Sequence, residues 1–366
     1  MNRFQKTRAF VPAFLLAATI AGTAMSAQAA QPSGINGENR RIAHTVPGAI
    51  AARQRIAAMK GSAATNANKT LAYGGGTGGV GVLSGPAKVY LVYYGTQWGT
   101  ATVGTDGYTR FSNDPSGAGL AAQKMYKGIG TNGELWQAEL TQWCDGAVAT
   151  NATSCPAGST HIPYQTNVLA GVWYDNAAAS PSKASALQLA NEADKAAAHF
   201  GNTTAASNRY TYYVILSPTG TNPNDYKNPR TGYCAWHDHV ASYTTNLPHG
   251  DMAFSNQPYN TDVSFCGKNF LNAGSAGTLD GYTMTLGHEW HEMMSDQFPK
   301  NGAGGWTNHD STSSWFGYEN SDECAWISGS SPGGAANVTF STGTFAQQAS
   351  WSNDTNSCAI SHPVVP

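Results

Sequence analysis

The segment GHEWHEMMSDQFP, residues 287 to 299, carries the side chains best suited to chemistry. It approaches the zinc-binding pattern H-E-x-x-H, in which two histidines one helical turn apart hold the metal and the glutamate between them activates water. Here Glu292 stands at the second histidine position, and His291 comes one residue earlier. Because zinc accepts carboxylate oxygen as well as imidazole nitrogen, His288 and Glu292 can form half of a metal site. Glu289 then has the position of the catalytic base.

The helical period separates these residues from an expected core face. At 100° per residue, His288 and Glu292 share one stripe, and the apolar residues fall roughly opposite. His291 lies within the same arc as His288, so the pattern leaves open which two of His288, His291 and Glu292 bind. Asp296, one turn further along, can ligate or orient a ligand. The expected core face consists of Leu286, Trp290, Met293 and Met294.

A third ligand must come from elsewhere in the chain, and FGYENSDECAWI is the best source. Glu319 is expected to complete the site, and Asp322, about one turn later, to bind the metal or orient a ligand. This arrangement resembles that of thermolysin-like metallopeptidases, in which a downstream glutamate completes the site. Two further histidines are candidates. His237 in CAWHDH, a predicted strand, can be a ligand or a proton donor, because Cys266 shortly precedes the metal helix and brings this strand near it. His309, which lies between the two halves of the site, is a candidate proton donor.

The first 29 residues predict export from the cell. Three basic residues precede the apolar run FVPAFLLAATIAG, and a small-residue cleavage site follows near Ala29. We expect a secreted protein, extracellular or periplasmic, without a membrane span, because no later stretch approaches the ~20 apolar residues that a span requires. Six cysteines then favour disulfides. Proximity predicts the pairs Cys144 with Cys155, Cys234 with Cys266, and Cys324 with Cys358.

The composition limits the partners. Only 11% of residues are charged and the net charge is -2, so nothing favours nucleic acid or an anionic membrane. The expected partner is an extracellular protein, a peptide or a cell-wall substrate.

The chain divides into three parts by composition. After the signal peptide (1 to 29), residues 30 to 79 form a leader or pro-segment that ends in a flexible glycine-rich linker, YGGGTGGVG. Residues 80 to 366 form a single α/β domain, because predicted strands alternate with helices. The strands are expected at 88–95, 168–174 and 210–216, with a β-rich C-terminal part. The helices are expected at 117–128, 133–143, 181–200 and 281–297, the last capped by Asp280.

Several segments together resemble a known family. KVYLVYYGTQW, YYVILSPTGTNP, GYCAWHDH, GYENSDECAWI and FAQQASWSN are similar to segments of secreted bacterial relatives of the plant EXORDIUM or phosphate-induced proteins. The bacterial proteins have a helix HExxExxTDP, followed by ExxDxCAW and a WSN near a terminal Cys. This resemblance implies an extracellular, cell-wall-associated protein without a settled enzymatic activity. The bacterial pattern falls on His288, Glu289, Glu292, Asp296, Glu319 and Asp322.

These observations predict a secreted zinc-dependent hydrolase, a metallopeptidase-like endopeptidase. Zinc would be held by His288, Glu292 and Glu319, and Glu289 would take a proton from the attacking water. The alternative is a non-catalytic extracellular or cell-wall-associated protein with a structural metal, calcium or zinc, because carboxylate-rich sites also suit hard cations.

Overall fold

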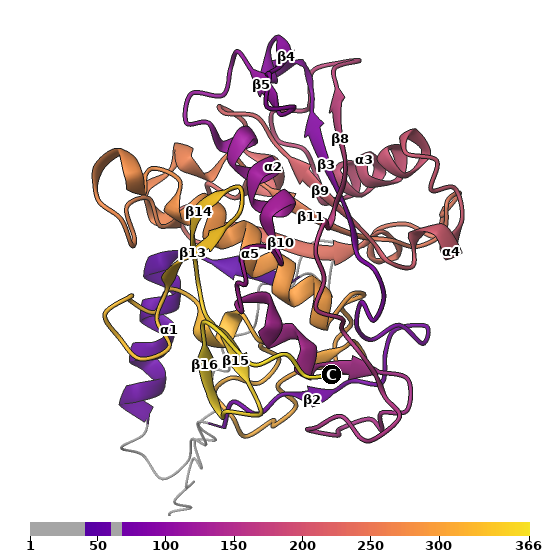
Figure 1. The fold of residues 1–366 in the computed structure, drawn as a ribbon, viewed down its shortest axis with the longest axis vertical. Coiled ribbons are helices and arrows are strands. Elements are labelled where there is room, and N and C mark those ends of the chain that lie inside the picture. The colour runs from indigo at the N-terminus through magenta and orange to yellow at the C-terminus, as the bar shows by residue number, and fades with distance from the viewer. Residues whose placement is uncertain (1–40, 60–67) are drawn as a thin grey trace, which may run out of the picture. The chain divides into compact units, whose positions relative to one another are not determined.

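The computed structural model describes residues 41–59 and 68–366, shown in Figure 1. The predicted signal peptide and the start of the leader lie outside the described residues. The described residues all fall within one compact unit, Pro32–Pro366. None of the described helices is long and apolar enough to cross a membrane.

A six-stranded sheet forms the centre of the fold and confirms the α/β class. Four neighbouring strands are parallel, and two antiparallel strands extend the sheet on one side. All six residues of the central strand β9 are buried, as expected for a strand covered on both faces. The order across the sheet is β1 (Arg41–His44), β10 (Tyr233–His239), β11 (Ala253–Gln257), β9 (Thr211–Leu216), β3 (Lys88–Tyr94) and β8 (Leu169–Asp175).

Helices cover both faces of this sheet. Helix α3 (Ala186–His199) packs on one face, whereas α2 (Ala118–Gly128) and α5 (Asp280–Ser295) pack with the other (Figure 1). The predicted helix at 181–200 begins later, because Ser185 and Gln188 form a capping box at its start. The predicted helix at 133–143 is instead a 3-10 helix, Gln137–Gln142.

The remaining strands are short. The β-rich C-terminal part contains two hairpins, β13 (Ala336–Phe340) with β14 (Gly343–Gln347) and β15 (Ser350–Ser352) with β16 (Ser357–Ala359). Two other strand pairs are β4 (Ala101–Val103) with β5 (Thr109–Phe111) and β6 (Cys144–Asp145) with β7 (Thr160–His161). The other α-helices of the described residues are α1 (Val46–Met59) and α4 (Ala205–Asn208).

The glycine-rich segment is packed against the body of the protein. β2 (Ala72–Tyr73) pairs with β12 (Trp306–Thr307), and the N–H of Gly74 donates to the carbonyl of Gly305 at 2.7 Å. A Cβ at Gly74 would lie 2.5 Å from the carbonyl oxygen of Gly304, so only glycine permits this approach. The segment is therefore packed at Gly74 and is not the flexible linker that the sequence predicted there.

All three predicted disulfides are present: Cys144–Cys155, Cys234–Cys266 and Cys324–Cys358. They fit a protein of an oxidising, extracellular compartment. Cys234 of one disulfide belongs to β10, and Cys324 of another lies within the segment FGYENSDECAWI, which carries the predicted third ligand.

Candidate metal centre

Helix α5 is buried along its whole length, which the sequence did not indicate. Its predicted apolar face joins the main core. The opposite side is also covered, because β10 and β14 pack against α5. The predicted cap at Asp280 is wrong: Asp280 is the first helical residue, and its carboxylate accepts N–H groups of Leu271 and Asn272 at 2.8 and 2.6 Å. Asp280 thus closes the preceding loop onto the helix.

Three side chains converge on one side of α5. Nε2 of His288 lies 3.0 Å from Oε1 of Glu292 and 3.6 Å from Oδ1 of Asp322. The N–H of Asp322 donates to Glu292 Oε1 at 2.9 Å, which ties the loop to the helix. Ligand atoms about 2.1 Å from a tetrahedral ion lie about 3.4 Å apart, so this spacing fits one ion. All three residues are at most 2% exposed.

A second group shares Glu292 with the first. Nδ1 of His237, on β10, lies 3.2 Å from Oε2 of Glu289 and 3.7 Å from Oε2 of Glu292. On the other side of the ring, Nε2 of His237 lies 3.3 Å from the backbone oxygen of Asp296 and can donate to it. This contact leaves the lone pair of Nδ1 facing the carboxylates. Each group has its candidate ligand atoms within 4.8 Å of one another.

Several polar atoms of the two groups are buried without a hydrogen bond. They are His288 Nε2, Glu289 Oε1, Glu292 Oε2 and both carboxylate oxygens of Asp322. Leaving such atoms unsatisfied is costly, and a cation among them would remove that cost. The donor set of one imidazole and two carboxylates suits zinc and harder divalent cations.

Burial and mutual repulsion change the protonation of these groups. Burial raises the pKa of Glu289 well above its usual value, although the charge of His288 opposes the shift. Burial and the charge of Asp322 raise the pKa of Glu292 to about 7. Burial lowers the pKa of His288, but the nearby carboxylates, Glu292 first, outweigh that effect and raise it well above its usual value. A metal ion must displace such protons when it binds.

Of the two acidic residues predicted in the downstream segment, Asp322 joins His288 and Glu292, whereas Glu319 does not belong to that group. Glu319 is buried, but it belongs to neither group, and its Oε1 lies 3.9 Å from Nε2 of His237. Asp322 is the residue beside His288 and Glu292. The predicted ligand set with Glu319 stays a prediction, and the geometry favours Asp322 as the third ligand.

His291 lies outside both groups. Its Nδ1 is 2.8 Å from Oγ of Ser350 and 3.4 Å from Oε2 of Glu139, and its ring packs 4.2 Å from that of Trp136. Burial lowers the pKa of His291 to about 3, so the ring is neutral at ordinary pH. The alternative pairing of His288 with His291 therefore finds no support in the geometry.

The other predicted residues have different surroundings. The carboxylate of Asp296 accepts the N–H of Gly305 at 2.5 Å, and its backbone oxygen lies 3.3 Å from Nε2 of His237. His309 is half-buried, contacts Asn151 at 2.8 Å and belongs to neither group. His237 was predicted as a ligand or a proton donor, near the metal helix because Cys266 shortly precedes that helix. The structure places it in one group with Glu289 and Glu292.

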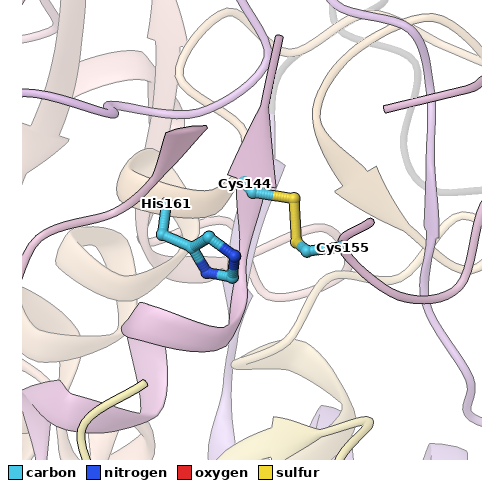
Figure 2. A group of neighbouring side chains, drawn as sticks. All are labelled: Cys144, Cys155 and His161. Carbon is cyan, nitrogen blue, oxygen red and sulfur yellow. A yellow bond between two sulfur atoms is a disulfide. The ribbon is translucent and has the colours of Figure 1, made fainter. Parts of the chain in front are cut away.

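Cys144, Cys155 and His161 form a third cluster of potential metal ligands, shown in Figure 2. The two sulfur atoms are joined in a disulfide, so they offer no thiolate to a metal. Nδ1 of His161 lies 2.7 Å from the backbone oxygen of Thr141 and can donate to it. This cluster is structural, and the groups around Glu292 are the better candidates.

Comparisons of the chain with protein-family models, with curated proteins and with solved structures each found no match. The arrangement of side chains around Glu292 is therefore the basis on which a function can be argued.

Proposed function

We propose that the protein is a secreted metal-dependent hydrolase, a zinc endopeptidase, with one ion held by His288, Glu292 and Asp322. The observation that carries the proposal is the buried set of imidazole and carboxylate atoms without hydrogen bonds around Glu292. When bound, the ion would polarise a carbonyl group and lower the pKa of a water molecule to about 7.

Glu289 is the proposed base. Its Oε1 has no hydrogen bond, and its Oε2 faces Nδ1 of His237 at 3.2 Å. Burial raises its pKa, which brings a carboxyl group closer to the range that proton transfer near neutral pH requires. Glu289 would take the proton of the attacking water and return it to the leaving amine. His237, whose Nε2 contacts the backbone oxygen of Asp296, would accept a hydrogen bond at Nδ1 from Glu289 when Glu289 carries the proton.

Substitution of Glu289 tests this assignment. In Glu289→Gln the carboxylate is lost but the shape remains, so the metal content should stay near that of the wild type while casein hydrolysis disappears. Glu134→Gln is the matched control, because Glu134 is also buried but caps backbone N–H groups outside both groups. Wild-type activity of Glu289→Gln would refute the assignment. Two bound ions per chain would instead make Glu289 a ligand together with His237.

The complete burial of the site favours a second candidate, a structural ion in a non-catalytic extracellular protein. The resemblance to the EXORDIUM relatives agrees with such a role. Under this alternative, a chelator would lower the melting temperature strongly, the purified protein would contain calcium or zinc, and no peptidase activity would appear at any pH. The two candidate functions are distinguished by elemental analysis, by melting curves with and without chelator, and by a casein assay.

A further inference from the structure

The outermost strand of the sheet comes from a separate part of the chain, the N-terminal arm, which we define as residues 41–59. Its strand β1 pairs antiparallel with β10, so that Arg41 lies opposite His237 and Ala43 opposite Ala235. β1 is the last strand on its side of the sheet. Without the arm, β10 would be the edge strand, and its backbone N–H and C=O groups would be open to another chain.

The arm also reaches the candidate catalytic base. The backbone N–H of Ala43 interacts with the carboxylate of Glu289. Ala43 is buried, and next to it the indole Nε1 of Trp326 donates to the backbone oxygen of His44 at 2.6 Å. β1 therefore occupies the position that a substrate chain would need in order to bring its backbone to Glu289 and His237.

The arm pairs with β10 through its backbone, and two of its small side chains pack against the body of the protein. Among its described side chains only Ala43 and Ala49 are buried, whereas Ile50 is 41% exposed. The two alanines pack with Ala235 and Met284 in one apolar cluster. Strand pairing depends on backbone hydrogen bonds more than on side-chain identity. A different extended chain can consequently form the same pairing with β10.

We infer that β10 is the substrate-binding strand, that it takes an extended polypeptide in antiparallel pairing, and that β1 is its intramolecular occupant. The inference rests on the proposed function for what happens to the bound chain. It assigns polypeptide as the substrate class. It also accounts for the burial of the site, because the arm must leave β10 before a substrate can approach Glu289.

Displacement of the arm tests the inference. Ala43→Asp places a carboxylate at a buried position in an apolar cluster, and the cost of burying that charge should expel β1, whereas Ile50→Asp adds the same charge at an exposed position of the arm. The probe is a fluorescent peptide of sequence RIAHTV, residues 41–46, titrated into the full chain. We expect Ala43→Asp to bind it at least ten times more tightly than the wild type and Ile50→Asp. Equal binding by all three proteins would overturn the inference.

A second variant distinguishes displacement of the arm from misfolding of the protein. Ala43→Pro removes the N–H that interacts with Glu289 without adding charge, and it should give the same gain in peptide binding. Melting curves and hydrogen exchange of the β10 amides identify variants in which the arm has left a folded body. A folded variant with exposed β10 amides but no gain in binding would contradict the inference. Retained β1 pairing in both variants would contradict it as well.

The hydrolysis of casein separates this inference from the proposed function. If both hold, Ala43→Asp cleaves casein at least ten times faster than Ile50→Asp. If the peptide binds more tightly but no variant cleaves casein, β10 is a polypeptide-binding edge and the hydrolase assignment fails. If the wild type and Ala43→Asp cleave equally fast, the hydrolase assignment stands and β1 is not an occupant of the substrate strand.

Discussion

Replacing Asp322 by Asn should separate the stability of the metal-free protein from its metal binding. In the metal-free protein, Asp322 repels the carboxylates of Glu292 and Glu289 but attracts the ring of His288. Unit charges about 4 Å apart interact by about 4 kcal/mol at an effective dielectric constant near 20, and here the two signs oppose each other. We expect the free energy of unfolding to change by no more than about 1 kcal/mol.

The metal-bound protein should respond very differently. An ion at one hundred times its dissociation constant stabilises the folded state by about 2.7 kcal/mol. For a chain of this size, the entropy of unfolding near the melting point converts this into a shift of about 4 °C. If the loss of the Asp322 carboxylate weakens binding about one hundredfold, the shift at the same zinc concentration should fall below about 1 °C.

The assay is a melting curve of chelator-treated protein with zinc added in steps, supported by elemental analysis. Asp354→Asn is the matched control, because its side chain is 54% exposed and belongs to neither group. Glu319→Gln, measured in parallel, decides between the two candidate third ligands. An undiminished shift in Asp322→Asn together with a lost shift in Glu319→Gln would refute the assignment drawn from geometry. No shift in the wild type would refute the site itself.

Three further predictions address the surroundings of the site and the fold. His291→Gln should cost about 1–3 kcal/mol of stability through lost buried contacts and leave zinc affinity unchanged; a loss of affinity would return His291 to the ligand set. Replacing Cys324 and Cys358 together by Ser should cost about 4 kcal/mol in the loop-entropy estimate, and it should weaken zinc binding, since the loop before Cys324 carries a ligand. Burial raises the pKa of Glu192 to about 8 in the folded protein, from an ordinary value of 4.5. The folded state therefore keeps a proton that the unfolded state releases, and stability should fall between about pH 4.5 and 8, by at most about 5 kcal/mol. Glu192→Gln should flatten that decline in melting curves; an unchanged slope would contradict the assigned pKa.

Much of the local structure could be predicted from the sequence alone. The period of the helix around His288 made Glu292 its neighbour one turn away, and the structure has the two side chains 3.0 Å apart. The three strands rich in β-branched and aromatic residues, and the three disulfides between cysteines close in sequence, were also confirmed. These features depend on residues near one another in the chain, where backbone geometry sets which side chains can meet.

Only the tertiary structure decided which residues complete the site. His237 and Glu289 are 52 residues apart and meet because the sheet places β10 beside α5. Glu319 lies in a loop and Asp322 in a short 3-10 helix. The N–H of Asp322 donates to Glu292, and the carbonyl of Asn320 accepts the N–H of Trp351 in β15, so long-range contacts fix this segment. The burial of α5 and the pairing of the arm with β10 likewise depend on the order of the strands in the sheet. Helical and strand periods carry no information on such long-range pairing, because it is selected by the packing of the whole core.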